Sequence, residues 1–479
     1  MNQTESLYQS YTGEAPAAVE QLPGAGSNRK YFRLTGVRTL VGVCGTSQEE
    51  NRAFVYMARH FRQKGLPVPE VYAVSADGYA YLQEDLGDMQ LFQAIAQGRQ
   101  TGIFSEEEKR LLRQTIRLLP RFQFEGAEGM DFGYCYPQAE FDRRCILWDL
   151  NYFKYCFLKA THAEFDESRL EDDFGSMADR LLAAPAQTFM YRGFQSRNVM
   201  LSDGHPCFID FQGGRKGPIY YDVASFLWQA KANLPASLRM ELAGEYLDAL
   251  KPYSAVGRTE FLSTLRHFVL FRTLQVLGAY GFRGYFERKP HFLQSIPYAL
   301  HNLQELLKDG FGEYPYLGKV LQDLCTRRDL TAEPCGKPSA ATRGLTVEVV
   351  SFSYRKGIPG DESGNGGGYV FDCRAVHNPG RYEAYRQLTG RDAPVVRFLE
   401  EDGEILRFLE HVDALADAHV ARYLERGFTH LCICFGCTGG QHRSVYSAQH
   451  VAEHLNRKFG VRVHLIHREQ HTEQILEAR

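Results

Sequence analysis

The chain has 479 residues, a formal net charge of −3, 44% hydrophobic residues and 24% charged residues. This length exceeds one ordinary folding core, so we expect two or three globular domains. The charge argues against a dedicated nucleic-acid binder, and no apolar run approaches the roughly 18 residues that a membrane-spanning helix needs.

The start of the chain lacks the basic residues and apolar core of a signal peptide. Its 11 cysteines show no framework spacing, which is typical of free thiols in a reducing compartment. We therefore expect a cytoplasmic protein without membrane attachment.

Residues 1–90 are expected to form a small β-rich lobe. Two short runs, 30–34 and 39–43, flank a Thr-Gly turn and predict a β-hairpin. The loop that enters this hairpin contains Gly24, Gly26 and Ser27. Such a loop can lay backbone N–H groups over nucleotide phosphates, and a plain turn is the alternative.

The same lobe continues with an apolar 3–4 spacing that predicts a helix over 50–64 and then a strand over 79–82. A polar segment follows this strand and contains Glu84 and Leu86. We expect this segment to be a hinge whose backbone groups hold an adenine edge.

Residues 91–325 are expected to form a second, mainly helical lobe. Its most informative segment is Tyr-Arg-Gly-Phe-Gln-Ser-Arg-Asn at 191–198, which is followed at a strand end by Asp210. Phosphoryl transfer needs oxygen ligands for Mg²⁺ and a residue that orients the attacking hydroxyl. Asn198 and Asp210 are the candidate metal ligands, because a hairpin would bring them together.

Position 193 of this loop is where the orienting base is expected, and it holds a glycine. The catalytic candidates are therefore Gly193, as the position of the missing base, with Arg192 and Gln195 shaping the loop. Asp222 opens a later helix and is expected to tie down the loop or cap that helix.

A polar stretch at 326–344 is rich in Pro, Gly, Ser and Thr and predicts a linker. Residues 345–479 then predict a separate α/β domain. Within it a strand at 430–435, a glycine-containing loop, an amphipathic helix ending near Phe459 and a strand at 461–465 form one unit.

The loop of this unit is expected to bind a phosphate or carboxylate, because backbone N–H groups at a helix start attract anions. The candidate ligands lie in the loop and in an earlier segment: Arg374, Asn378, Cys437, Thr438, Gly439, Gly440, His442, Arg443 and Ser444.

Two other interpretations of the loop stay open. The spacing from Cys437 to Arg443 and Ser444 is that of a cysteine phosphatase loop, in which a thiolate attacks a bound phosphate. Alternatively, Cys432, Cys434 and Cys437 could bind zinc with a nearby histidine, although their spacing matches no standard zinc motif.

The first 325 residues resemble a known family through Arg-Gly-Phe-Gln-Ser-Arg-Asn at 192–198, Ile-Asp-Phe-Gln at 209–212 and Tyr-Asp-Val-Ala at 221–224. These segments are similar to the aminoglycoside phosphotransferase family, in particular to the sugar-1-kinases for N-acetylmuramate and N-acetylglucosamine. The resemblance implies an α+β bilobal protein-kinase-like fold that uses ATP and Mg²⁺.

The chain departs from that family in two places. The family has aspartate where Gly193 stands, and the loss of such a group commonly costs about 10²–10⁴-fold in rate. The usual phosphate-pairing lysine is also absent, since no lysine lies between Lys30 and Lys64.

Three ordered segments of the last domain, 351–359, 371–379 and 436–445, resemble the C-terminal domain of the RNase adapter protein RapZ. This resemblance implies binding of a phosphorylated amino sugar and, in some members, of small RNAs. Residues 345–479 hold slightly more acidic than basic residues, so the charge does not support RNA binding.

Two functions follow as hypotheses. The first is an ATP-dependent phosphotransferase that acts on a sugar hydroxyl and carries a phosphosugar-sensing domain. The second is a non-catalytic, nucleotide-binding pseudokinase regulator with the same domain, in which Gly193 has removed the activity.

Overall fold

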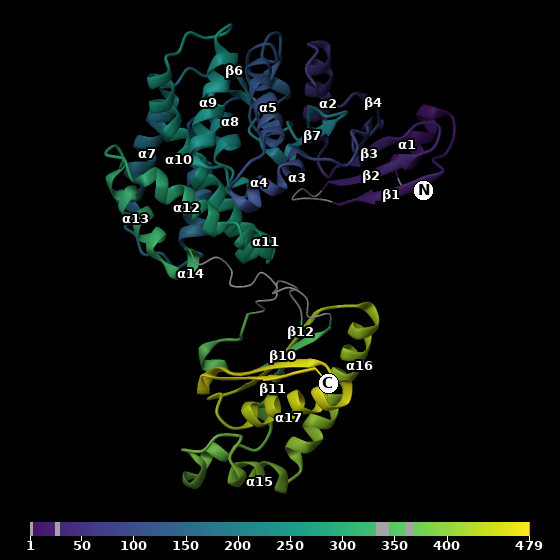
Figure 1. The fold of residues 1–479 in the computed structure, drawn as a ribbon, viewed down its shortest axis with the longest axis vertical. Helices are drawn as coiled ribbons and strands as arrows, with labels where there is room; N and C mark the ends of the chain where they lie inside the picture. The colour runs from purple at the N-terminus through teal and green to yellow at the C-terminus, as the bar shows by residue number, and fades with distance from the viewer. Residues whose placement is uncertain (1–2, 24–28, 332–343, 361–367, 479) are drawn as a thin grey trace. The chain divides into compact units, whose positions relative to one another are not determined.

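The computed structural model describes residues 3–23, 29–331, 344–360 and 368–478. The predicted loop residues Gly24, Gly26 and Ser27 lie outside them. The chain divides into two compact units, Met1–Pro334 and Cys335–Arg479 (Figure 1).

The first unit begins with a five-stranded antiparallel sheet in the order β1-β2-β3-β5-β4. A short helix, α1 (Gln3–Thr12), packs against this sheet. The predicted hairpin is confirmed as β2 and β3. The strands are β1 (Ala18–Leu22), β2 (Lys30–Thr35), β3 (Leu40–Cys44), β4 (Val71–Val74) and β5 (Ala80–Glu84).

Helix α2 (Gln48–Gln63) connects β3 to β4 and confirms the helix predicted near 50–64. It begins at Ser47, whose hydroxyl accepts the backbone N–H of Glu50, and this cap satisfies one of the free donors of the first turn. Phe54 and Phe61 are buried on its inner face. Both rings stack on or meet the ring of Phe211, so α2 is packed directly against the segment that carries Asp210.

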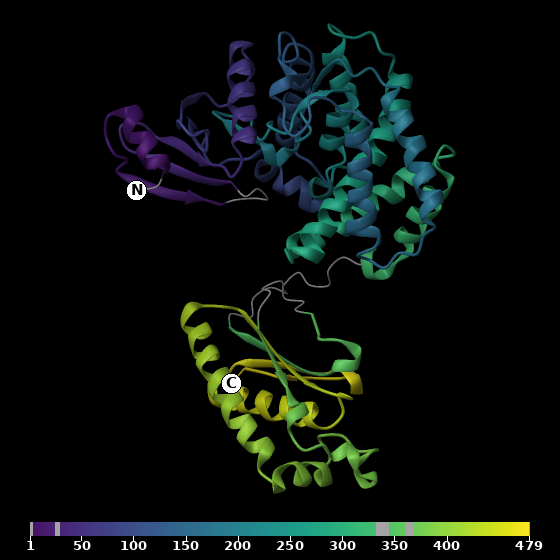
Figure 2. The ribbon, with the colours of Figure 1, turned by 180° about the vertical axis from the view of Figure 1, so that it is seen from behind.

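The remainder of the first unit is mainly helical, as predicted. It lies beside the sheet, as Figure 1 and the view from behind in Figure 2 show. Its α-helices are α3 (Leu91–Ala94), α4 (Ala96–Thr101), α5 (Glu106–Phe124), α6 (Arg143–Phe153), α7 (Glu167–Leu182), α8 (Tyr220–Leu227), α9 (Ala236–Leu250), α10 (Arg258–Gly281), α11 (Pro290–Leu293), α12 (Ile296–Leu307), α13 (Pro315–Thr326) and α14 (Arg328–Thr331). One continuous core joins these helices to the inner face of the sheet. The unit is thus a bilobal α+β fold, as the sequence predicted.

Two small hairpins lie within the helical lobe. One pairs β6 (Thr188–Met190) with β9 (Arg215–Gly217), and the other pairs β7 (Val199–Ser202) with β8 (His205–Phe208). The catalytic-loop segment runs between β6 and β7, so both hairpins hold its ends.

The predicted linker at 326–344 starts later than expected. Residues at its beginning form the end of α13 and the short helix α14, in which Leu330 is buried. The charged composition of this stretch suggested a linker, although a buried apolar side chain, Leu330, holds the short helix α14 against the core. Residues 332–343 lie outside the described part of the chain.

The second unit is a separate α/β domain, as predicted, with a five-stranded mixed sheet in the order β11-β12-β10-β13-β14. The first four of these strands are parallel, and β14 pairs antiparallel with β13. The strands are β10 (Thr346–Ser353), β11 (Gly368–Asp372), β12 (His430–Cys437), β13 (Arg462–His467) and β14 (Thr472–Leu476).

Three helices complete this unit: α15 (Ala393–Glu401), α16 (Glu404–Arg426) and α17 (Arg443–Phe459). Helix α17 packs on β10, β12 and β13 and contacts α16 (Figure 1). The apolar spacing from Val445 to Leu455 is buried in this contact, which confirms the predicted amphipathic helix.

No helix within the described ranges combines the length and the apolar character needed to cross a bilayer.

Candidate functional site

A buried carboxylate fixes the backbone of the loop that follows β6. Asp222, in α8, accepts hydrogen bonds from the backbone N–H groups of Tyr191 at 2.7 Å and Arg192 at 2.8 Å. Burial raises the pKa of Asp222 to about 7, and the two N–H donors act against this rise. The predicted structural role of Asp222, tying down the loop, is confirmed.

Arg192 adopts a left-handed backbone conformation, with φ of 67°. Its guanidinium donates to both carboxylate oxygens of Asp149 in α6, at 2.9 and 3.1 Å. A non-glycine residue in this conformation is strained, and the ion pair together with Asp222 holds it there. Gln195 is half-buried, and its side chain forms no hydrogen bond within the described residues.

The two predicted metal ligands lie side by side. Asn198 precedes β7 and Asp210 follows β8, and the hairpin brings the Asn198 Nδ2 to 3.0 Å from the Asp210 Oδ2. The same amide group donates to the Gly193 carbonyl at 2.8 Å, and Gln212 donates to the other Asp210 oxygen at 2.7 Å. The Asn198 side chain therefore lies directly against the Asp210 carboxylate, with its amide nitrogen on the near side.

These donors suit Mg²⁺, which takes one or two protein oxygens and leaves its other positions to phosphates and water. Asp210 is open to solvent and holds a left-handed backbone with φ of 67°. The surrounding protein nonetheless raises the pKa of its carboxyl, while Gln212 and then Arg29 lower it. Among the described residues, no group of three or more His, Cys, Asp or Glu could hold a metal ion.

Gly193 has little room for a side chain. A Cβ placed there would lie 2.9 Å from the Asp210 carbonyl oxygen and 3.3 Å from the Asn198 Nδ2. Position 193 therefore lacks a carboxylate and also has a backbone carbonyl close to the place that a side chain would occupy.

A cation that the sequence did not single out stands next to this site. Arg29, buried just before β2, lies 3.2 Å from the Glu50 carboxylate of α2, and its positive charge lowers the pKa of Asp210. The sequence showed no lysine to pair with phosphates, but Arg29 places a positive charge near Asp210 from the residue before β2. The sequence signal for this ion pair was weak: an arginine beside a predicted strand and a glutamate early in a predicted helix. Many proteins contain both features without such a pair.

The predicted hinge follows β5 and is braced against the sheet. Arg33 of β2 donates to Asp85 at 2.6 Å and to Asp88 at 2.7 Å. Leu86 is buried in a small cluster with Met200 and Cys207 of the β7–β8 hairpin. Glu84 ends β5, and its backbone N–H donates to the Glu70 carbonyl at 2.9 Å. The hinge and the metal-ligand hairpin thus share one apolar contact.

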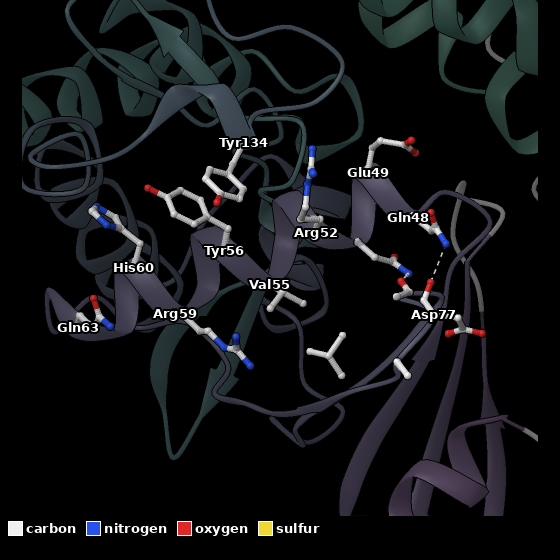
Figure 3. Close-up of a pocket in the computed structure, with 14 residues that line it drawn as sticks. Gln48, Glu49, Arg52, Val55, Tyr56, Arg59, His60, Gln63, Asp77 and Tyr134 are labelled. Carbon is white, nitrogen blue, oxygen red and sulfur yellow. Dashed lines mark hydrogen bonds between the residues drawn. The ribbon is translucent and has the colours of Figure 1, made fainter.

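A pocket of about 790 Å³ lies elsewhere, along the outer side of α2 (Figure 3). Arg52, Tyr56 and Arg59 project from the helix around it, and the ring of Tyr134 stacks on Tyr56 with centroids 4.2 Å apart. None of the predicted site residues lines this pocket.

In the second unit, the predicted anion loop joins the end of β12 to the start of α17. The sulfur of Cys437 lies 3.1 Å from the Ser444 hydroxyl. Burial tends to raise the pKa of Cys437, but donors from Ser444, the charge of Arg443 and the backbone N–H of Gly440 lower it overall. Ser353, at the end of β10, donates to the Thr438 carbonyl at 2.8 Å and fixes the loop.

Gly440 has φ of +66°. A Cβ there would lie 2.9 Å from the backbone nitrogen of Ser353 and 2.4 Å from the Glu469 Cγ. Gly439, by contrast, is exposed and faces open space. Gly440 therefore allows the loop to lie directly against the end of β10.

The side chains expected to surround an anion are mostly engaged within the protein. Arg443 was expected to donate to the anion, but its Nη1 donates to the Arg374 and Val376 carbonyls, each at 2.8 Å, because these buried groups need partners. The His442 ring contacts the Tyr385 carbonyl at 2.9 Å. Arg374 pairs with Asp372, and Asn378 accepts the Gly380 N–H.

Several charged or polar side chains of the expected site thus support the loop backbone, while the buried Arg443 Nε makes no hydrogen bond within the described residues. Thr438 and Gly439 of the loop are exposed, so their main-chain N–H groups stay candidates for an anion. The phosphatase interpretation retains a thiol with a lowered pKa, but Cys437 is buried and Arg443 is committed to carbonyls.

The zinc interpretation is wrong for the described residues. No group of three His, Cys, Asp or Glu within them could hold a metal. Cys432 and Cys434 lie on one face of β12 with their sulfurs 3.5 Å apart, while Cys437 belongs to the loop contact with Ser444.

Comparison with known families agrees with this geometry. The model described as the phosphotransferase enzyme family matches residues 18–259, which is more than half of the chain. The chain therefore belongs to the phosphotransferase enzyme family. The model of the RapZ C-terminal domain matches residues 345–471, so the second unit is a domain of this type. Both resemblances seen in the sequence are confirmed.

Among individual proteins, a nucleotide-binding protein of Albidiferax ferrireducens is 40% identical over 115 residues, which are 24% of this chain and 36% of the relative. A nucleotide-binding protein of Cereibacter sphaeroides is 46% identical over 110 residues, which are 23% of this chain and 34% of the relative. The chain spans about a third of the length of these curated relatives.

Two solved structures are also similar. The ADP-bound aminoglycoside phosphotransferase APH(2'')-Ib has a TM-score of 0.45 at 12% identity, covering 64% of this chain and 97% of its own. Choline kinase from Cryptosporidium parvum Iowa II has a TM-score of 0.43 at 11% identity, covering 64% of this chain and 93% of its own. At these values they add nothing to the family assignment.

Proposed function

We propose that the first unit binds ATP with Mg²⁺ and transfers the γ-phosphoryl group to a hydroxyl of an amino sugar such as N-acetylmuramate or N-acetylglucosamine. The observation that carries this proposal is the meeting of Asn198 and Asp210 at 3.0 Å, beside the Arg29–Glu50 ion pair. Membership of the phosphotransferase family supports the same reaction class.

Each part of the site has a task in this proposal. Asn198 and Asp210 would hold Mg²⁺, which neutralises charge on the phosphates when it is bound. Arg29 would pair with phosphate oxygens, since a guanidinium donates strong charge-assisted hydrogen bonds to them. The hinge at Glu84 and Leu86 would hold the adenine edge.

The second candidate is a nucleotide-binding pseudokinase regulator, and the surroundings of Gly193 favour it. Glycine at position 193 has no side chain to orient the acceptor hydroxyl, and the Asp210 carbonyl oxygen lies 2.9 Å from the place that a Cβ would take. Nucleotide binding does not need this position, so binding would persist without efficient transfer.

Gly193→Asp is expected to raise phosphoryl transfer to the amino sugar by about 10²–10⁴-fold, because it supplies the group that orients the attacking hydroxyl. The Asp210 carbonyl, a backbone atom 2.9 Å from the place of the new Cβ, must shift to admit it. Turnover is measured with ATP–Mg²⁺ and each sugar, and ATP affinity by calorimetry.

Gly193→Ala is the matched control, because it adds the same Cβ without a carboxylate. Equal turnover in both variants and the unmodified protein, with ATP affinity retained, would establish the regulator in place of the enzyme. Loss of ATP affinity only in the two variants would show that the closed loop tolerates no side chain.

We infer that the second unit senses a phosphorylated amino sugar through the loop at 438–442. The loop lies at the carboxyl end of parallel strands and at the start of α17, where ligands of open α/β sheets and anions bind. The match to the RapZ C-terminal domain supports the same ligand class.

Gly440→Ala is expected to weaken binding of glucosamine 6-phosphate at least about tenfold, because a side chain at this positive φ pushes the loop off the end of β10. Gly439→Ala is the matched control and should bind normally, since its Cβ meets open space. Calorimetry on the full chain measures both. Normal binding by Gly440→Ala would place the ligand elsewhere.

A further inference from the structure

Three basic side chains gather beside the catalytic loop, and we call them the cationic cluster: Arg99 of α4, Arg197 of the loop and Lys231 of the turn before α9. The Arg99 and Arg197 guanidinium carbons lie 3.5 and 4.2 Å from the centroid of the same ring, Phe92. Arg197 directly precedes the proposed metal ligand Asn198. The cluster therefore borders the reaction site.

Main-chain hydrogen bonds hold the cluster together. Arg99 donates to the Phe92 carbonyl at 3.0 Å and to the Lys231 carbonyl at 3.3 Å. The Lys231 Nζ donates to the His291 carbonyl at 3.0 Å. These contacts bring α3, α4, the turn before α9 and α11 to one place in the first unit (Figure 1).

The cluster has no carboxylate to balance it. Within the described part of the first unit, no Asp or Glu forms an ion pair with Arg99, Arg197 or Lys231. Glu108 acts on Arg99 from a distance, but its carboxylate already accepts the backbone N–H groups of Gly98 and Ser105.

The positive charges of these basic groups consequently make protonation of their neighbours less favourable. Burial first, and then the charges of Arg197 and Arg99, lower the pKa of Lys231. Burial and Arg197 lower the pKa of Arg99 in the same way. The pKa of His291 is lowered by burial, then by Lys231 and Arg197. Such repulsion is relieved when an anion enters.

Other arginines of the first unit show the usual arrangement. Arg33 pairs with Asp85, Arg113 with Glu241 and Arg239 with Glu305. Two half-buried positive charges, Arg99 and Lys231, lie in the cationic cluster with the exposed Arg197, and no described carboxylate forms an ion pair with any of them. Positive charges from separate segments in such an arrangement are typical of a binding site for a negative group.

We propose that the cationic cluster binds an anionic group, phosphate or carboxylate, of the acceptor molecule. This inference rests on the proposed function and narrows its substrate to a negatively charged sugar. The cluster would anchor the acceptor through charge-assisted hydrogen bonds while one of its hydroxyls faces the phosphoryl group. A cationic acceptor would be repelled.

Thermal unfolding of the full chain, with the non-hydrolysable nucleotide AMP-PNP and Mg²⁺ present, tests this site. The probes are D-glucuronate, glucose 6-phosphate and their neutral counterpart D-glucose, because a ligand that binds the native state raises its stability. We expect one or both of the sugar anions to raise the melting temperature and glucose to leave it unchanged.

Arg99→Gln and Lys231→Gln should each weaken the apparent glucuronate affinity at least about tenfold, which corresponds to about 1.4 kcal/mol. Lys289→Gln is the matched control, since it removes a charge nearby that Glu287 already neutralises at 2.9 Å. It should respond to glucuronate like the unmodified protein.

The proposal is overturned if neither glucuronate nor glucose 6-phosphate gives a shift, or if the shift survives in both Arg99→Gln and Lys231→Gln. A shift with inorganic phosphate but with neither sugar anion would assign the cluster to a free anion and also overturn it. A cluster-dependent glucuronate shift without any response to AMP-PNP would support the anion site while removing the proposed kinase function.

Discussion

Asp210→Asn is expected to abolish the contribution of Mg²⁺ to ATP binding, weakening ATP affinity in the presence of the metal by about 100-fold, or about 2.7 kcal/mol. The asparagine keeps the size of the side chain and tolerates the left-handed backbone at φ of 67°. It removes the negative charge that a hard divalent cation requires. Calorimetry with and without Mg²⁺ measures the effect.

The amide would also face two donors, because Asn198 and Gln212 both donate to the carboxylate at present. Asp203→Asn provides the control, since Asp203 lies in the exposed β7–β8 turn with φ of 50° and loses the same charge. If Asp210→Asn bound ATP–Mg²⁺ as tightly as Asp203→Asn, the metal site assigned to this hairpin would be wrong.

Arg29→Met is expected to weaken ATP binding by about 10- to 100-fold, because a hydrogen bond to a charged group contributes about 1.5–3 kcal/mol. Adenosine, which has no phosphates, should bind nearly as before. Methionine fills a similar length without charge, and it leaves Glu50 of α2 without the cation 3.2 Å away. Paired titrations with ATP and adenosine measure the difference.

The same change should shift the pH dependence of metal binding. Arg29 lowers the pKa of Asp210, so its loss raises that pKa further above the ordinary value. In the proposed site Asp210 would bind Mg²⁺ as the carboxylate, and a smaller ionised fraction of it would remain at a given pH. The midpoint of Mg²⁺-dependent ATP binding should therefore move to higher pH in Arg29→Met.

Arg29→Lys keeps the charge and should restore most of the ATP affinity, which separates an electrostatic role from packing. Arg38→Met is the surface control, because Arg38 lies exposed between β2 and β3. Equal losses for ATP and adenosine in Arg29→Met would show that Arg29 only supports the fold, and the assignment to phosphate would then fail.

The loop from Tyr191 to Asn198 and the return to Asp210 could be predicted because the signal is local. A short hairpin between two fixed positions must bring its ends together, so the spacing alone implied that the two side chains meet. The strand, loop and helix that carry Cys437 and Gly440 were predictable for the same reason.

The hydrogen-bond partners of Arg443 could not be predicted in this way. Its spacing within the loop suggested a donor to an anion, but the structure directs it to the Arg374 and Val376 carbonyls. Which partner an arginine takes depends on the buried carbonyl groups around it, and those come from a segment about 70 residues earlier in the chain.

By itself the sequence determined the two-part architecture, the family of each part and the local hairpin and loop that carry the candidate ligands, because each depends on residues close together in the chain. Only the tertiary structure decided that Arg29 stands beside Glu50, that the Asp210 carbonyl closes on Gly193, and that Arg99 and Lys231 join Arg197. These contacts form between distant segments, and packing of the whole unit selects them among many partners that the sequence allows equally.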